Sequence, residues 1–292
     1  IKTQFFMHNI NKTYQKLRYF AVACGLFAIM YIADDYFKSQ LPDTALQLSD
    51  DEMRILIDDI GRQSKASPHS LEAKKIPNFK NYDDVIEKKR AFFAYLLPEI
   101  QHQNTVTLIK RRAVKSIAQQ LEAHHNLSPF TVKLLKNMRR EYKIDKGLTD
   151  LQATAVLLHR VDMIPPELVL IQAANESGWG TSRFARKGYN FFGLWCFKEG
   201  CGFVPRRRNE GTLHEVAKFK DLSHAVKTYI RNLNRHYAYK ELRDIRADLR
   251  AQDKPITANA LVHGLQSYSE RGQDYIDELL SMMRVNKEHM NL

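Results

Sequence analysis

The sequence predicts a mainly α-helical protein of the α+β class, with one small β lobe, and three observations predict it. Apolar residues recur at helical spacing in segment after segment of the 292-residue chain, as in amphipathic helices. A single stretch, residues 196–220, combines glycines, an arginine run and alternating apolar residues, a pattern typical of strands and turns. No internal repeat or low-complexity tract interrupts the sequence, and its length suits one large domain or two small ones.

The N-terminal segment has the features of an export signal. Three basic residues precede an unbroken apolar run over residues 19–33, and two aspartates follow it, an order that places the start of the chain in the cytoplasm. As a helix the run would span only about 22 Å, short of the roughly 30 Å hydrocarbon core. That length favours a signal-peptide core, but Tyr31 stands where a cleavage site requires a small residue. We expect an uncleaved signal anchor over residues 1–36, with a cleaved signal as the alternative.

A helical N-terminal region is expected over residues 37–146, beginning with a linker to about residue 48. Ser49 and Glu52 have the spacing of a capping box ahead of an amphipathic helix that ends near residue 60. Further helices are expected at about 83–97, at 105–124, and from Ser128-Pro129 onward. We find no catalytic group of residues in this region, so its apolar residues are assigned to packing.

The second region, residues 147–292, is expected to hold the functional site. Helices are predicted at 148–159, 166–177, 222–233 and 242–249, after a cap at Thr257, and after Gly272. Residues 196–220 are predicted to form a small antiparallel hairpin.

Glu176 is the strongest candidate for chemistry. It ends a short apolar helix that begins at Pro165-Pro166 and stops at Gly178. Burial and the negative end of the helix dipole both favour the protonated form of its carboxyl group. A carboxylic acid that keeps its proton can protonate a departing glycosidic oxygen. Gln172, four residues earlier, shares its face of the helix.

The segment after Glu176 is rich in aromatic residues, which serve equally well to stack on sugars and to build a core. Both tryptophans of the chain, Trp179 and Trp195, lie in it. Cys196 and Cys201 enclose four residues, a spacing that suits a disulfide in an exported protein. A zinc site would need two more ligands, and only His214 is near, so we expect no metal and no cofactor.

The net charge of +12 indicates an acidic or polyanionic neighbour. The first interpretation is simply a solvated basic face. An anionic envelope polymer or membrane surface comes next, and nucleic acid comes last because no nucleic-acid-binding motif accompanies the basic runs. We therefore expect no nucleic-acid partner.

Several motifs, in order along the chain, resemble the bacterial glucosaminidase family that cuts peptidoglycan. They are Ala-Asn-Glu-Ser-Gly-Trp-Gly-Thr-Ser at 174–182, Tyr-Asn-Phe-Phe-Gly at 189–193, the segment 219–229, and Tyr268-Ser269 ahead of Tyr275. Other stretches resemble the Bax-type branch of that family, namely 88–98, 191–197, 205–208, 214–216 and 268–272. The resemblance runs from about residue 76 to the C-terminus.

This resemblance implies a lysozyme-like fold for residues 147–292 and hydrolysis of β-1,4 bonds of N-acetylglucosamine in peptidoglycan. It implies that Glu176 is the general acid and that Tyr268 positions or stabilises the reacting sugar. The residues expected to bind the glycan are Trp179, Tyr189, Asn190, Phe192 and Trp195. Glu215 and Glu210, followed by Glu199, are candidates for the second catalytic group, although each is equally well explained as a solvated residue. The substrate's own acetamido group is a further route that needs no second carboxylate.

Two other functions remain open. A lytic transglycosylase also uses a Glu-Ser pair at a helix end, although Tyr189, Asn190 and Tyr268 favour the hydrolase. A non-catalytic glycan-binding scaffold is the second alternative, because the base is uncertain and the helical N-terminal region could serve a partner. The predicted partners are peptidoglycan glycan strands and the inner membrane. The predicted location is its periplasmic face, or secretion if the signal is cleaved, and no protein partner is predicted.

Overall fold

The computed structural model describes residues 48–63, 75–205, 214–290 and 292. The predicted signal anchor over residues 1–36 and most of the linker lie outside the described residues. Among the helices that are described, none combines the length and the apolar character that a membrane crossing requires.

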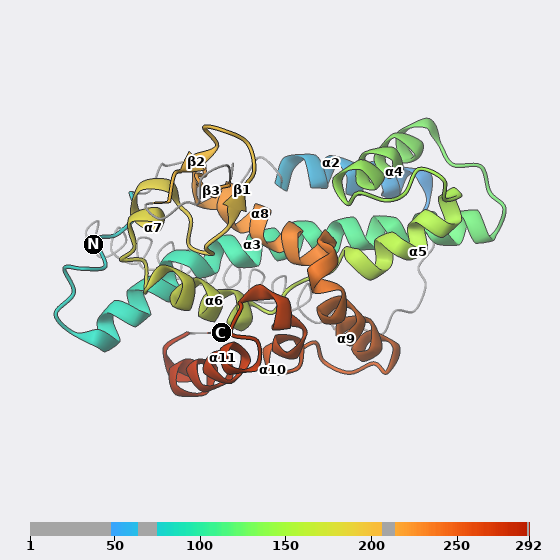
Figure 1. Ribbon diagram of the computed structural model, residues 1–292. Helices are drawn as coiled ribbons and strands as arrows, with labels where there is room; N and C mark the ends of the chain where they lie inside the picture. The colour runs from blue at the N-terminus through green and yellow to red at the C-terminus, as the bar shows by residue number, and fades with distance from the viewer. Residues whose placement is uncertain (1–47, 64–74, 206–213, 291) are drawn as a thin grey trace, which may run out of the picture. The chain divides into compact units, whose positions relative to one another are not determined.

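The described residues cluster as one compact unit made mostly of helices, with one small sheet (Figure 1). This confirms the mainly helical class with a small β lobe. The helices are α2 (Asp50–Gln63), α3 (Val85–Glu122), α4 (Pro129–Glu141), α5 (Asp150–Arg160), α6 (Pro166–Ser177), α7 (Arg183–Gly188), α8 (Leu222–Arg235), α9 (Lys240–Ala251), α10 (Ala258–Leu261) and α11 (Gln273–Asn286). Short 3-10 turns are η1 (Tyr237–Tyr239), η2 (Val262–Tyr268) and η3 (Lys287–His289). The strands are β1 (Trp195–Cys196), β2 (Gly202–Phe203) and β3 (Glu215–Ala217).

The helix starts follow the capping chemistry of the sequence. Ser49 and Glu52 form the predicted capping box, with the Glu52 carboxylate accepting from the Ser49 amide at 2.8 Å. Thr149 and Gln152 form a second one at the start of α5. Pro166 opens α6, where a missing amide hydrogen costs nothing. Each segment predicted as a helix in the described part of the chain is helical, although two of these segments form a single helix, and the short α7 was not predicted.

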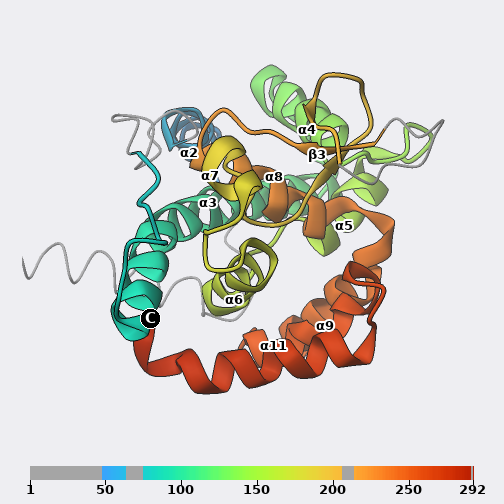
Figure 2. The same cartoon turned by 60° about the vertical axis from the view of Figure 1, so that its left-hand side comes forward.

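The prediction of two helices over 83–97 and 105–124 is wrong, because α3 runs unbroken through Pro98. Pro98 lies on the exposed side of the helix, as does Ala94, whose carbonyl loses its partner to the proline ring. Water can satisfy that carbonyl, so the helix bends instead of ending. Figure 2 shows the N-terminal part of α3 running at an angle to the rest.

The predicted antiparallel hairpin over residues 196–220 is present as β2 and β3, and β1 adds a third strand that was not predicted. The sheet has the order β1-β3-β2, so β1 and β2 each pair antiparallel with β3 and not with each other. Trp195 lies opposite Val216, and Gly202 lies opposite Ala217. Gly202 has to be glycine, since a Cβ there would meet the Val216 carbonyl oxygen at 2.0 Å. The central strand therefore comes from the far end of the predicted segment.

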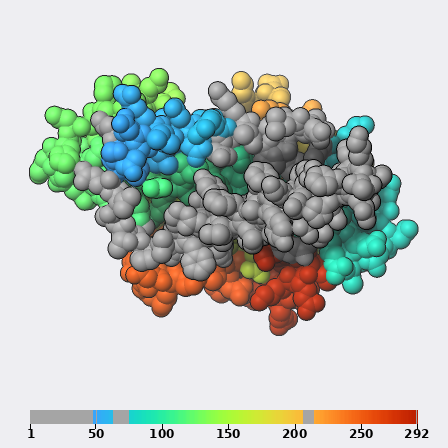
Figure 3. Space-filling view, turned by 180° about the vertical axis from the view of Figure 1, so that it is seen from behind, coloured from blue at the N-terminus to red at the C-terminus, as the bar shows by residue number. Residues whose placement is uncertain are grey.

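Two apolar cores lie along α3. The first joins the N-terminal part of α3 to α6, α8 and α11, and the second joins its C-terminal part to α2, α4 and α5. Figure 3 shows the surface of α2, in blue, against the green segment that holds α3 to α5. The predicted domain boundary at residue 147 does not coincide with this division, because α5 belongs to one core and α6 to the other.

In the first core, α6 lies between α3 and the C-terminal helices α10 and α11 (Figure 1). Its apolar residues from Leu168 to Ile171 are fully buried, which explains why the helix is apolar on every side. Gly264 lets η2 approach α9 closely, because a Cβ there would come within 2.3 Å of the Leu242 backbone. This contact brings Tyr268, at the end of η2, into the neighbourhood of α6.

Candidate active site

Glu176 stands at the C-terminal end of α6, where the buried helix meets the surface. Gly178 ends the helix in the left-handed conformation, with φ of +56°, a geometry that glycine adopts without strain. The buried Ser177 hydroxyl donates to the Ala173 carbonyl at 2.6 Å and accepts from the Gly180 amide at 2.8 Å. The helix end and the following loop are thus fixed together, which holds the Glu176 backbone in place.

The two carboxylate oxygens of Glu176 have different surroundings. Oε1 accepts a hydrogen bond from the Tyr275 hydroxyl at 2.9 Å. Oε2 faces the exposed Gly193, which has φ of +62° and where a Cβ would come within 3.1 Å of that oxygen. Glycine at 193 therefore leaves Oε2 as the oxygen that an outside group can approach.

A chain of three hydrogen bonds fixes the direction of the Tyr275 proton. The buried Tyr229 hydroxyl donates to Gln172 Oε1, and Gln172 Nε2 donates to the Tyr275 oxygen at 3.0 Å. Because the amide nitrogen can only donate, the Tyr275 oxygen accepts there and its own hydrogen is free to point at Glu176. The chain keeps Oε1 as an acceptor, so the proton of a neutral Glu176 belongs on Oε2.

Electrostatics favour the protonated form of Glu176. Partial burial raises the pKa of this carboxyl group above its usual value, and the nearby Glu278 adds to the effect. The hydrogen bond from Tyr275 and the charge of Arg271 act in the opposite direction, and the net direction is upward. Of the two predicted causes, burial is therefore confirmed as the leading one, whereas the effect of the helix dipole stays a prediction.

Tyr268 lies beside this carboxyl group, as the resemblance implied, but its hydroxyl is engaged elsewhere. It donates to the Phe192 carbonyl at 2.8 Å, and its ring is parallel to that of Tyr275 at 5.7 Å between centroids. Burial raises the pKa of Tyr268 well above its usual value, so it remains a neutral phenol. Its contact with the backbone positions the segment that contains Gly193.

Tyr189, Asn190 and Phe192 lie in the loop that carries Gly193, and two of the three are buried. The Asn190 amide donates to the carbonyls of Leu194 and Ala217, both at 2.9 Å, and so ties the loop to β3. The Phe192 ring is 1% exposed and stacks on Tyr229 at 4.1 Å. Tyr189 is half-buried and caps α7 with φ of 52°.

The two tryptophans have different environments. Trp179 is partly buried, with its ring edge-on to Phe92 and Phe93 of α3 at 5.6 and 5.3 Å and with Lys89 at 5.2 Å. Trp195 is 49% exposed, and its ring lies edge-on to the His214 ring at 4.9 Å between centroids. Of the aromatic residues expected to bind the glycan, Trp195 offers the most open face.

The β lobe contains a disulfide and a buried carboxylate. Cys196 and Cys201 are joined, with Cα atoms 6.2 Å apart. Glu215 is 3% exposed, and its two oxygens accept from the Gly200 and Gly202 amides at 3.0 and 2.7 Å. This carboxylate therefore holds the cross-linked loop to β3. Its oxygens lie close to both sulfurs, the one such metal-like grouping in the described part of the chain, but the disulfide removes the thiolates that a metal would need.

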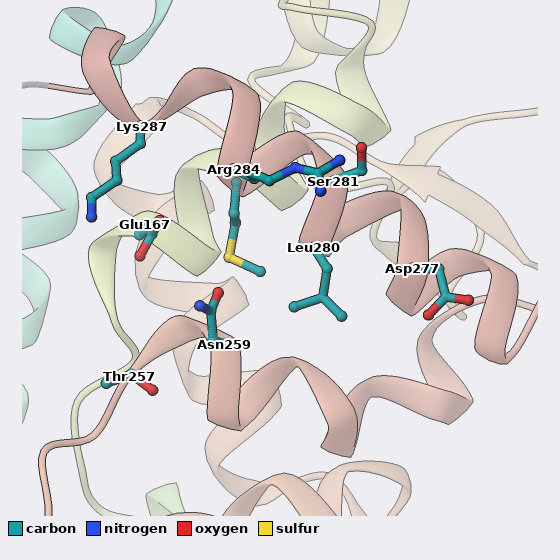
Figure 4. A pocket seen from close by; sticks show the side chains of 9 residues that line it. Glu167, Thr257, Asn259, Asp277, Leu280, Ser281, Arg284 and Lys287 are labelled. Atoms are coloured by element: carbon teal, nitrogen blue, oxygen red, sulfur yellow. The ribbon is translucent and has the colours of Figure 1, made fainter.

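A separate pocket lies at the other end of α6, between Glu167 and the C-terminal half of α11 (Figure 4). Asn259, Asp277, Arg284 and Lys287 are among the residues that line it. Glu176 and its tyrosine neighbours do not, so this pocket is distinct from the site at Gly193.

Sequence reasoning missed Tyr229 and the role of Tyr275 in orienting Glu176. Gln172 gave a signal, because an amide on the buried face of an apolar helix needs partners. Its partners come from α8 and α11, 57 and 103 residues away, and helical spacing carries no information about them.

Comparisons with known proteins define the class. The Glucosaminidase family model, described as mannosyl-glycoprotein endo-beta-N-acetylglucosaminidase, matches residues 152–288, which include Glu176, Tyr268 and Tyr275. Protein bax of Escherichia coli K12 is 33% identical over 229 residues, covering 78% of this chain and 80% of that protein. No solved structure gave a significant match. The chain belongs to the Bax-type branch of the glucosaminidase family, which supports a glycan-cleaving, peptidoglycan-related role.

Proposed function

We propose that this protein hydrolyses β-1,4 bonds of N-acetylglucosamine in cell-wall peptidoglycan, with Glu176 as the general acid on a lysozyme-like fold. The observation that carries the proposal is the asymmetry of the Glu176 carboxyl group. One oxygen accepts from Tyr275, while the other faces the exposed Gly193 and is the oxygen on which a neutral Glu176 would carry its proton. This is the arrangement that a leaving glycosidic oxygen requires.

In the proposed reaction, Glu176 Oε2 gives its proton to the glycosidic oxygen as the bond to the anomeric carbon breaks. The leaving sugar departs with a new hydroxyl group, and water completes the hydrolysis and restores the proton to Glu176. Tyr268 and Asn190 act by holding the loop that carries Gly193, and Trp195 supplies an aromatic face for a sugar ring.

The second catalytic group in this proposal is the acetamido group of the substrate, which attacks the anomeric carbon and gives retention of configuration. Glu215 was the first candidate from the sequence, but both its oxygens accept backbone hydrogen bonds within the β lobe. Glu210 lies outside the described residues, and Glu199 is exposed.

The test is turnover of purified cell wall by the wild type, Glu176→Gln and Glu167→Gln. Glu167 is a matched control because it lies on the same helix, is half-buried, and has a pKa that burial also raises. We expect Glu176→Gln to lose at least 10²–10⁴-fold in rate while glycan binding survives, and Glu167→Gln to stay active. Equal activity of the wild type and Glu176→Gln would overturn the assignment.

Product analysis separates the hydrolase from a lytic transglycosylase. A free reducing N-acetylglucosamine end is expected, and an anhydro-muramic end would establish the transglycosylase instead. A glycan-binding scaffold would show no turnover in any variant while retaining affinity for the wall.

The envelope location and membrane anchoring belong to the same proposal. They are supported by the order of basic, apolar and acidic residues around residues 19–33. Cell fractionation of the full chain should place it in the inner-membrane fraction, and recovery in the cytoplasm would contradict the proposal.

A further inference from the structure

One face of α8 carries a row of basic residues. The row consists of residues spaced three or four apart, which aligns them on one side of the helix: His224, Lys227, Arg231 and Arg235. The opposite side packs into the first core through Val226, Tyr229 and Leu233, and Tyr229 belongs to the chain that ends at Glu176. The basic row is therefore separated from the candidate active site by the thickness of the helix.

This row meets two residues from other helices. Lys110 of α3 pairs with Glu141, the last residue of α4, at 2.9 and 2.8 Å. Arg235 donates to the Glu141 carbonyl at 2.9 Å. The charges of Lys227 and Arg231 also act on the Glu141 carboxylate and help to lower its pKa. Figure 1 shows α8 crossing α3 in this part of the molecule.

The charges in this cluster do not balance. The single carboxylate of Glu141 is surrounded by four cations, Lys110, Lys227, Arg231 and Arg235. Four cations against one anion leave a formal excess of three positive charges. Asp221, at the start of α8, lies beside His224 and Lys220.

Lys227 and Arg231 carry the unbalanced charge. Both are half-buried, and neither makes a hydrogen bond or ion pair with any other residue that the structure describes. Arg231 Nε is fully buried with no acceptor. Burial, followed by the charge of Lys110, lowers the pKa of Lys227. A solvated basic face would leave such cations in water, whereas these two are partly desolvated beside like charges, which is unfavourable without an anion.

We propose that this cluster, formed by Lys227 and Arg231 of α8 with Lys110, Arg235 and Glu141, is a binding site for a phosphoryl group. A phosphate dianion offsets two of the three excess charges, and its oxygens accept from a guanidinium group in a bidentate manner. The phosphoryl group can belong to a free phosphate or to the phosphodiester of a lipid headgroup, which carries one negative charge and presents the same phosphoryl oxygens to a guanidinium group.

The test compares the full-length wild type with Lys227→Gln/Arg231→Gln, which removes the two cations without partners. The matched control is Lys80→Gln/Lys254→Gln, which removes the same charge from two exposed positions elsewhere. Calorimetric titration with inorganic phosphate at constant ionic strength should show binding by the wild type and the control. The Lys227/Arg231 variant should bind at least tenfold more weakly. Phosphate should raise the Tm of the first two proteins and not of the third.

No binding by the wild type, or equal binding by all three proteins, would overturn the proposal. Thermal melts in phosphate-free buffer guard against misfolding, because removing two mutually repelling cations should leave Tm unchanged or higher. Co-sedimentation with phosphatidylglycerol vesicles, against phosphatidylcholine vesicles, then identifies the source. If only the Lys227/Arg231 variant loses co-sedimentation with phosphatidylglycerol vesicles, the phosphoryl group belongs to a lipid headgroup. Any N-terminal anchor is common to all three proteins and cannot cause that difference. If all three proteins sediment equally with the vesicles while the Lys227/Arg231 variant loses phosphate binding, the ligand is a free phosphate.

Discussion

At the scale of single residues, the hydrogen bond between Tyr275 and Glu176 controls the acid. Burial raises the pKa of Glu176, and the Tyr275 hydroxyl partly offsets this because it stabilises the carboxylate. Folding therefore favours the protonated form of Glu176, and the Tyr275 hydroxyl limits the rise of its pKa. The sequence identified Glu176 from its place at a helix end, whereas Tyr275 entered only as part of a family motif.

Tyr275→Phe should shift the pH dependence of turnover. Loss of the hydrogen bond raises the pKa of Glu176 further, and the acid must be protonated to act, so the alkaline limb of kcat/KM should move to higher pH. The shift should be on the order of one pH unit, since a hydrogen bond to a charged group contributes about 1.5–3 kcal/mol. A kcat/KM profile against pH measures it.

Tyr239→Phe is the control for that profile. Its ring is near Tyr268, at 5.8 Å, but its hydroxyl makes no hydrogen bond to Glu176 in the structure. Its alkaline limb should match that of the wild type. An unmoved or lowered limb in Tyr275→Phe would show that this tyrosine does not set the acidity of Glu176.

At the scale of elements, the β lobe is too small to be held by its ladder alone. Its strands are two or three residues long, and the loop between β1 and β2 depends on the disulfide and on the two backbone hydrogen bonds to Glu215. The sequence predicted the disulfide. It did not predict that Glu215 holds the same loop by accepting two backbone hydrogen bonds, because the pairing of β3 with both other strands comes from the tertiary fold.

Glu215→Gln should cost stability more than activity. The amide cannot accept from both glycine amides, so the free energy of unfolding should fall by about 1–3 kcal/mol. Turnover measured well below Tm should fall less than tenfold. A loss of 10²-fold or more, with Tm unchanged, would instead identify Glu215 as a catalytic base. Glu241→Gln, at an exposed position on α9, should change neither quantity.

At the scale of the whole molecule, a buried ionic cluster ties the two cores together. Asp162 follows α5 and is 2% exposed. It pairs with Arg250 of α9 at 2.9 Å and with Arg111 of α3 at 3.6 Å, and Arg246 lies at 4.0 Å. Burial alone would raise the pKa of Asp162, but these three guanidinium groups outweigh it and hold the pKa at about 2.

Asp162→Asn should destabilise the protein by about 3–5 kcal/mol at neutral pH, because it removes the anion that faces two buried guanidinium groups, Arg111 and Arg246, and the partly buried one of Arg250. The lowered pKa means that the aspartate contributes stability above its unfolded value of 3.8 and loses it as the pH falls towards about 2. Urea unfolding at pH 7 and near pH 2 measures the difference in free energy of unfolding between the wild type and Asp162→Asn. This difference should nearly disappear at the lower pH.

Asp244→Asn is the control for this cluster. Asp244 pairs with His159 and Lys240, but its side chain is 41% exposed, so its loss should cost less than about 1 kcal/mol. An equally small effect at Asp162 would mean that the buried cluster does not hold the cores together.

The predictions from the sequence succeeded where local physics is sufficient and failed where distant segments compete. Correct predictions depend on neighbours within one helical turn. They are the caps at Ser49 and Thr149, the start of α6 at its prolines, and the position of Glu176. The break at Pro98 failed because its exposure, which lets water satisfy the freed carbonyl, is set by packing of the other face of α3.

The sequence by itself determined the helical class, the small β lobe, the disulfide, the family and the residue that acts as acid in the proposed mechanism. Each of these is encoded in spacing along the chain. Only the tertiary structure decided which oxygen of Glu176 is held by Tyr275, how β3 became the central strand, and which basic residues of α8 lack a counter-charge. These features depend on groups brought together from distant parts of the sequence, whose contacts exist only after both cores have packed.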